Sequence, residues 1–132
     1  MTAFESKAVI NKPLGEVYQF LADMNKHQQL MPENISDWSS TVDQARFNIQ
    51  NMASIALRID SRVENSEIRI ISFEKPPFKL ELKWVLSSTG SVTEVLFTIA
   101  ADLNAMMKML ASGPLQKLAD HETQSLAAIF SK

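Results

Sequence analysis

The sequence predicts an α+β domain in which a curved antiparallel sheet of six to seven strands wraps around a long C-terminal helix. Two observations predict this class. Alternating apolar and polar residues fill most of the chain from residue 35 to residue 101, and a helical pattern follows from about residue 104 to residue 130. Short turns between strands favour antiparallel pairing, and a sheet of this size curls and leaves a concave face that the helix must cover. The 132 residues suffice for one such domain, which we place at residues 1–132.

The N-terminal region predicts a strand followed by two short helices. The segment "AFESKAVINK" alternates in polarity, as a half-buried strand does. Pro13 then opens a helix, because proline is tolerated in the first turn, and an apolar stripe follows at helical spacing: Leu14, Val17, Tyr18 and Leu21. The next segment, "MNKHQQLMPEN", predicts a short helix or turn that ends at Pro32, since the residue before a proline disfavours helical geometry.

The middle of the chain predicts consecutive strands. The clearest is "FKLELKWVL", residues 78–86, which alternates strictly and should direct one row of side chains inward: Phe78, Leu80, Leu82, Trp84 and Leu86. The segments "RFNIQ", "SIALRID", "SEIRIISFE" and "SVTEVLFTIAA" predict further strands, and "ISDWSSTV" is a weaker candidate. Pro76 and Pro77 should interrupt the pairing between their neighbouring strands.

The last predicted element is a helix with Asn104 or Asp102 available as its N-cap. Its first turns contain Met106, Met107 and Met109, which cannot all face one core. We expect Met107 to be core and the other two, which point away from it, to pack on a neighbouring loop; the wall of a ligand cavity and a surface for a partner are the alternatives. Gly113 and Pro114 predict a kink near Ser112, because proline removes a helical hydrogen bond.

Composition argues against several classes of function. The formal net charge is −2 and no block of Lys or Arg stands out, so we expect no binding to nucleic acid. The absence of cysteine excludes thiolate zinc sites and disulfides, and histidine occurs only at His27 and His121, so we expect no metal and no cofactor. No apolar run is long enough to insert into a membrane, and we expect a cytoplasmic protein.

The order of elements, with "NKPLGEVYQFLADMNKHQQLMPENISDW" after the first strand and "ADLNAMMKMLASGPLQKL" after the last, resembles the START-like (SRPBCC) superfamily. This superfamily has the helix-grip fold and includes polyketide cyclases and coenzyme-Q-binding proteins. The resemblance covers essentially the whole chain. It implies a hydrophobic or amphipathic ligand held between the curved sheet and the long helix, and it carries over no catalytic motif.

Glu122 is the candidate functional residue that stands out from the pattern. On a helical wheel it lies within the apolar face, between Leu115, Leu118, Leu126 and Ile129. A carboxylate there must reach water, find a cationic or hydrogen-bonding partner, or take up a proton. We therefore predict a ligand-binding set of Tyr18, Trp84, Met107, Ala111, Leu115, Leu118 and Glu122. No catalytic residue is assigned, and Glu122 and His121 are the candidates.

Three functions remain open on the sequence alone. The first is binding of a hydrophobic small molecule; the second is a cyclase- or dehydratase-type enzyme that uses Glu122 with His121 or Tyr18. The third is a co-chaperone-like or homodimeric interaction module that uses the methionine region. A cavity above a few hundred Å³ would favour binding or catalysis. A collapsed core with Met106 and Met109 exposed would favour interaction.

Overall fold

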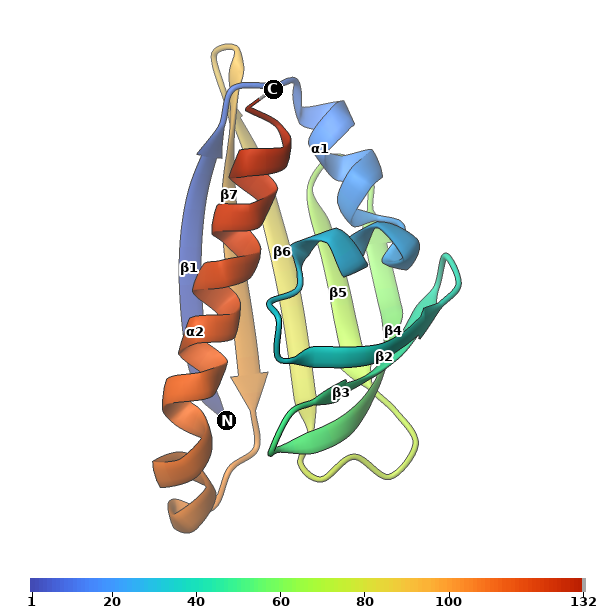
Figure 1. Cartoon of the computed structure of the whole chain (residues 1–132). Helices are drawn as coiled ribbons and strands as arrows, with labels where there is room; N and C mark the ends of the chain where they lie inside the picture. The colour runs from blue at the N-terminus through green and yellow to red at the C-terminus, as the bar shows by residue number, and fades with distance from the viewer. Residues whose placement is uncertain (132) are drawn as a thin grey trace.

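The computed structural model describes residues 1–131. A seven-stranded antiparallel sheet of order β1-β7-β6-β5-β4-β3-β2 curls around one long helix, α2, as Figure 1 shows. This confirms the predicted α+β, helix-grip architecture. The elements in chain order are β1 (Thr2–Ile10), α1 (Leu14–Leu21), the 3-10 helix η1 (Met24–Leu30), β2 (Ile35–Ser40), β3 (Gln44–Ile49), β4 (Ala53–Val63), β5 (Glu67–Ser72), β6 (Leu80–Thr89), β7 (Val92–Ala101) and α2 (Ala105–Ile129).

Strand β6 has the orientation that its alternation predicts. The row Phe78, Leu80, Leu82, Trp84 and Leu86 is buried, whereas Lys79 and Lys83 are exposed on the other face. Its pairing with β7 places Leu82 opposite Ile99 and Trp84 opposite Phe97, so that two apolar rows form the floor of the core. A slip of one residue would exchange the two faces, and the buried row fixes the register.

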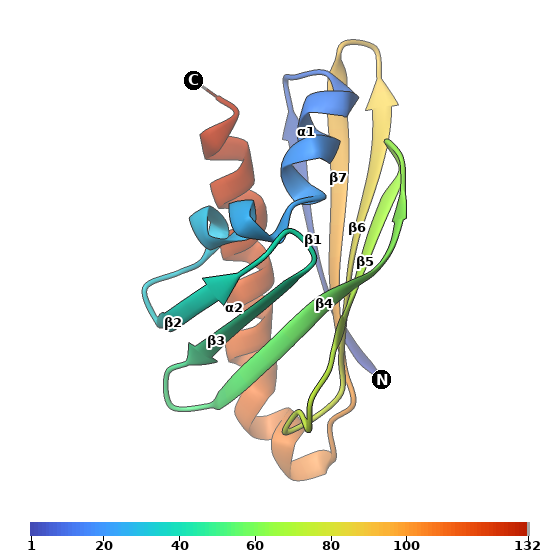
Figure 2. The same cartoon turned by 90° about the vertical axis from the view of Figure 1, so that its right-hand side faces the viewer.

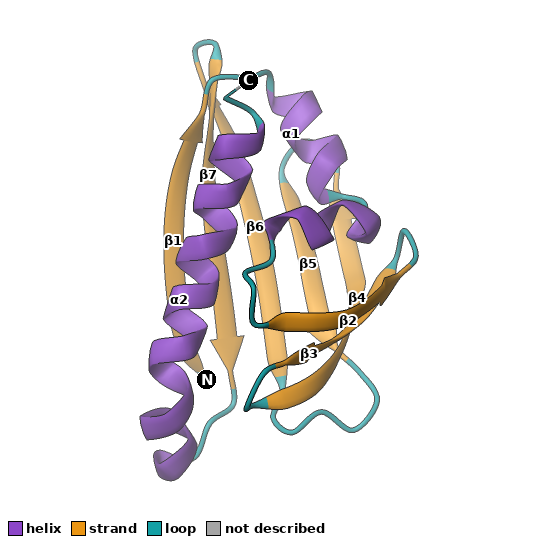
Figure 3. Ribbon diagram, in the orientation of Figure 1, coloured by secondary structure: helices purple, strands orange, loops and turns teal. Residues whose placement is uncertain are grey.

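Helix α2 is tied to one side of the sheet. It lies along β1 and β7 (Figures 1 and 3), where the hydroxyl groups of Ser6 and Thr123 are 2.6 Å apart and the side-chain amide of Gln116 donates to the carbonyl oxygen of Glu5. The hairpin of β2 and β3 faces the helix from the other side (Figure 2). Among residues 1–131, no side-chain hydrogen bond or ion pair joins α2 to β2 or β3. Only side-chain packing closes the sheet against the helix there.

The first turns of α2 are capped but open to solvent. The side chain of Asn104 accepts a hydrogen bond from the backbone N–H of Met107 at 2.9 Å, as expected of an N-cap. Helix α2 continues through Pro114 to Ile129, although Pro114 cannot donate to the carbonyl oxygen of Leu110.

No helix among residues 1–131 is both long enough and apolar enough to cross a membrane.

Candidate functional site

A small cavity of about 20 Å³ lies between α2 and the concave face of the sheet. Side chains from α2, β3, β4, β6 and β7, together with Met31 after η1, surround it: Met31, Phe47, Ile49, Ile55, Leu57, Leu80, Leu82, Ile99, Leu115, Leu118 and Glu122. All of these are apolar except Glu122. The space has room for roughly one water molecule, but a buried water needs two to four polar partners and this wall offers one. The cavity is therefore an apolar pocket with a single polar group.

Glu122 is buried in this wall without a partner. The residue is 1% exposed, and within the described part of the chain its Oε1 atom has no hydrogen-bond partner. Burial alone raises the pKa of this carboxyl group from 4.5 to about 8, because removing the group from water penalises the charged form. Of the three outcomes open on the sequence, the structure supports uptake of a proton. A neutral carboxyl group can both donate and accept a hydrogen bond.

A second small hollow adjoins the cavity. Its volume is about 10 Å³, and it is lined by Asn34, Ile35, Ile49, Met52, Pro114, Leu115 and Leu118. It shares Ile49, Leu115 and Leu118 with the cavity. Met52 and Leu118 are half-buried. These residues form a seam between α2 and the β2–β3 hairpin, next to the cavity.

The structure brings together three of the seven residues predicted to bind a ligand. Leu115, Leu118 and Glu122 line the cavity. The other four lie outside its lining. Tyr18 is half-buried on α1, Ala111 is buried and Met107 half-buried on earlier turns of α2, and Trp84 is buried in β6 with its ring stacked on Phe97 at 3.9 Å between centroids.

The two catalytic candidates are not brought together either. His121 is exposed while Glu122 is buried, since consecutive helical residues point in different directions. Tyr18 is absent from the lining of the cavity as well. Glu122 therefore faces no second acid or base there.

Sequence reasoning missed the opposite wall of the cavity. Phe47, Ile49, Ile55 and Leu57 on β3 and β4 complete it, together with Met31. The alternation of "RFNIQ" and "SIALRID" contained a usable signal, because it places these side chains on one face of each strand. The pairing of Phe47 with Ile55 in the β3–β4 register then brings the two rows together.

His27 is a second buried titratable residue, on η1. Its Nε2–H donates to the carbonyl oxygen of Leu21 at 2.8 Å in the neutral tautomer that this contact favours, and the ring meets Trp84 edge-on. Burial lowers the pKa of the imidazole, although the contact with Leu21 and the nearby Asp23 oppose this. We interpret His27 as a structural residue that fastens η1 beneath α1.

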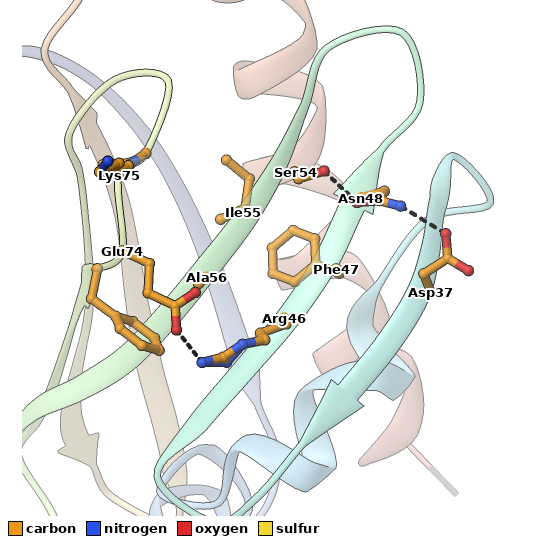
Figure 4. Close-up of a pocket in the computed structure, with 11 residues that line it drawn as sticks. Asp37, Arg46, Phe47, Asn48, Ser54, Ile55, Ala56, Glu74 and Lys75 are labelled. Atoms are coloured by element: carbon orange, nitrogen blue, oxygen red, sulfur yellow. Dashed lines mark hydrogen bonds and ion pairs between the residues drawn. The ribbon is translucent and has the colours of Figure 1, made fainter.

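A wider hollow, shown in Figure 4, shares Phe47 and Ile55 with the cavity but is otherwise lined by other residues. It is an open groove of about 630 Å³ between strands β3 and β4 and the loop after β5. Several of its polar groups pair with one another. Arg46 pairs with Glu74, the amide of Asn48 donates to Asp37 at 2.7 Å, and the hydroxyl of Ser54 donates to Asn48 at 2.7 Å. The groove offers volume but no unpaired buried group that would select a ligand.

Within residues 1–131, no cluster of three or more His, Asp or Glu side chains is arranged as a metal site.

Comparison with known proteins gives likeness of structure rather than of sequence. No protein-family model matches the chain, and no curated protein matches it. Three solved structures are similar over nearly their whole length. A START superfamily protein from Mycobacterium smegmatis has 15% identity and a TM-score of 0.71, with 98% of this chain and 97% of that chain covered. The Zhui aromatase/cyclase from Streptomyces sp. R1128 has 11% identity and a TM-score of 0.73, with 98% and 93% covered.

The third is the Aha1 dimer from Colwellia psychrerythraea, with 15% identity, a TM-score of 0.69, and 98% of this chain and 96% of that chain covered. Identities this low are evidence of fold and not of shared activity. Together with the order of strands around α2, the three likenesses show that this chain has the same helix-grip fold as these proteins.

Proposed function

We propose that the protein binds a small apolar molecule between the sheet and α2, at the cavity that contains Glu122. The observation that carries this proposal is the unpartnered Oε1 atom of Glu122 in an otherwise apolar wall. Leaving a buried polar group unsatisfied costs on the order of 1–3 kcal/mol, whereas an apolar residue of similar size would cost nothing there. A residue that weakens the core in this way is better explained by a ligand than by packing.

Binding requires the cavity to expand. Its volume of about 20 Å³ is far below the few hundred Å³ of an ordinary ligand site. The walls that can move are the half-buried Met31, Met52 and Leu118 along the seam, where no polar contact among the described residues holds α2 to β2 or β3. Methionine adapts its shape readily because its side chain is unbranched. We therefore interpret the structure as the closed form of the site.

The test is binding of tetralin, an uncharged bicyclic hydrocarbon, measured by equilibrium dialysis and by the shift in melting temperature. We expect saturable binding and a higher Tm, because a ligand that prefers the native state stabilises it. Leu118→Ala should strengthen binding by removing part of the wall, while the control Lys117→Ala, at an exposed position of the same helix, should leave it unchanged. No saturable binding by either wild type or Leu118→Ala would refute the proposal.

An enzyme is less well supported than a binding protein. One of the similar structures is named an aromatase/cyclase, and a protonated Glu122 could serve as a general acid. Acid–base chemistry of that type needs a second polar group near the reacting atoms. The cavity lining contains none besides Glu122. The arrangement supports recognition of a ligand without supplying a reaction.

Association of two copies is the second candidate function, and a specific observation favours it. Met106, Met109 and Leu110 are 71%, 87% and 71% exposed and lie at i, i+3 and i+4 on the first turns of α2. A collapsed core with exposed methionines is the pattern that we associate with an interaction module, and the similar Aha1 structure is described as a dimer. The two functions are compatible, because this patch lies on the side of α2 that faces solvent.

Analytical ultracentrifugation over a range of concentrations tests the association. We expect a dimer that dissociates on dilution and that Met109→Glu weakens, because the added carboxylate would be buried between copies. The control Lys117→Glu changes an exposed residue of the same helix outside the patch. A wild-type protein that stays monomeric throughout the concentration range would overturn this candidate.

A further inference from the structure

The position of Glu122 restricts the chemistry of the ligand. Its carboxyl group is the one polar group in the described lining of the cavity, it is 1% exposed, and its Oε1 atom has no partner. The helix cannot turn this group out to water without exposing Leu115 and Leu126, which share its face and are buried. Any molecule that fills the cavity must therefore lie against this carboxyl group.

The charges around the cavity determine which polar group can meet Glu122. The other lining residues come from α2, β3, β4, β6, β7 and the segment after η1, and none of them is titratable. An anionic ligand would thus find no cation, and it would face a carboxyl group that ionises itself at higher pH. A cationic ligand could pair with an ionised Glu122, but both charges would leave water, and the wall has no acceptor for the remaining N–H groups of an ammonium.

A hydrocarbon would leave the carboxyl group without a hydrogen-bond partner. A neutral carboxyl group has an O–H to donate, and a carbonyl oxygen is the simplest group that accepts it. Building on the proposed function, we infer that the natural ligand is an uncharged, mainly apolar molecule with a carbonyl-type oxygen that accepts a hydrogen bond from the side chain of Glu122. The raised pKa of Glu122, about 8, keeps this donor protonated at neutral pH.

Three compounds with the same bicyclic skeleton test this inference: tetralin, its ketone 1-tetralone, and its amine 2-aminotetralin. Dissociation constants are measured by equilibrium dialysis at pH 6 for the whole chain. We expect 1-tetralone to bind about three- to tenfold more tightly than tetralin, which corresponds to one net hydrogen bond. The amine, which is charged at this pH, should bind more weakly than either.

Variants assign the preference to Glu122. Glu122→Leu should bind tetralin and 1-tetralone equally, because the donor is gone. Glu122→Gln should keep a preference for the ketone through its amide N–H, and this preference should not change between pH 6 and pH 9, whereas that of the wild type should fall as Glu122 ionises. The control Gln124→Leu changes an exposed position on the same helix and should retain the wild-type preference.

The outcomes separate the inference from the proposed function. Saturable binding of all three compounds without a preference for 1-tetralone overturns the inference and leaves the proposed function standing. The inference is likewise overturned if the preference survives in Glu122→Leu, or if 2-aminotetralin binds most tightly. If none of the three compounds binds, the proposed function fails first and the inference fails with it.

Discussion

The outer groove is far larger than the inner cavity, but the two also differ in how their polar groups are paired. The groove of Figure 4 measures about 630 Å³ and contains both an arginine–glutamate pair and a chain of hydrogen bonds from Ser54 through Asn48 to Asp37. The cavity measures about 20 Å³ and contains one carboxyl group with no bond at Oε1. The larger space pairs several of its polar groups and leaves Lys75 exposed to solvent, whereas the smaller one buries a polar atom that has no partner.

This difference has an energetic origin. The side chains of Arg46 and Glu74 are 45% and 56% exposed, so water screens their attraction and would solvate either of them alone. Glu122 has no such alternative, and its side chain must remain neutral or weaken the fold. Buried polar groups without partners are rare in native proteins. Among residues 1–131, the other buried side-chain atom without a partner, Nε1 of Trp84, lines neither space, so the carboxyl group of Glu122 locates the candidate site better than the larger groove does.

Truncation of the cavity wall should have the largest effect on stability. Leu115 is 1% exposed and lines both the cavity and the hollow beside it. Leu115→Ala removes buried methyl groups and enlarges a space that already exists, so we expect a loss of about 2–5 kcal/mol in the free energy of unfolding. Denaturant titration measures this loss. A cost below about 1 kcal/mol would mean that the surrounding side chains fill the space left by the substitution. The cavity wall would then be less rigid than its comparison with the groove implies.

Glu122 should make stability fall as the pH rises. Below pH 4.5 the carboxyl group is protonated in both the folded and the unfolded chain; between 4.5 and about 8 the unfolded chain releases the proton while the folded chain keeps it. Unfolding becomes easier across this window, by about 3 kcal/mol at pH 7. Glu122→Gln should remove this dependence, so that the variant is more stable than wild type at pH 8 and similar to it at pH 4.5.

Denaturant titrations of both proteins from pH 4 to pH 9 measure this effect. Parallel curves for wild type and Glu122→Gln would show that the carboxyl group reaches water, and Glu122 would then be withdrawn as a site. A variant that is less stable than wild type at every pH would instead reveal a cationic partner.

The direction of the side chains that line the cavity follows from sequence periodicity, whereas the size of the cavity does not. The helical period placed Glu122 on the apolar face of the last helix, and the strand period placed Trp84 and Leu82 inward; both predictions are confirmed, because local geometry determines the direction of a side chain. The size of the cavity depends on how side chains of five elements fill the space between them. Met31 and Phe47 are far from Glu122 in sequence, and nothing local predicts that they meet it.

Residue type alone was a weaker guide. Trp84 was expected in the ligand wall because aromatic rings make large apolar surfaces, but pairing of β6 with β7 stacks it on Phe97 instead. Helical spacing correctly directs Met106 and Met109 away from the side of Met107, but the expectation that they pack on a neighbouring loop is wrong, because both are exposed.

His27 should produce a smaller loss of stability on the acid side. Burial lowers the pKa of its imidazole below 6.5, so the unfolded chain takes up a proton before the folded chain does as the pH falls. The contribution of His27 to stability is therefore complete above pH 6.5 and declines below it. We expect this effect to be smaller than that of Glu122, because Nε2–H can donate to Leu21 in both protonation states. His27→Gln should reduce the loss of stability at acid pH and leave the dependence of stability on alkaline pH unchanged. A wild-type protein whose stability does not change at acid pH would contradict the role given to His27.

Arg46→Ala in the outer groove should have the smallest effect. The substitution breaks the pair with Glu74 and removes the guanidinium from the ring of Phe73, 5.2 Å from its centroid. Both groups are largely solvated, so we expect a change within about 1 kcal/mol that shrinks further at high salt. Denaturant titration at low and high salt checks this, with Glu74→Gln as the matched variant that removes the charge from the other side. Tetralin binding should be the same in Arg46→Ala as in wild type, because Arg46 lines the groove and not the cavity. If Arg46→Ala costs as much as Leu115→Ala, or abolishes tetralin binding, the groove is part of the functional site and the distinction between the two regions fails.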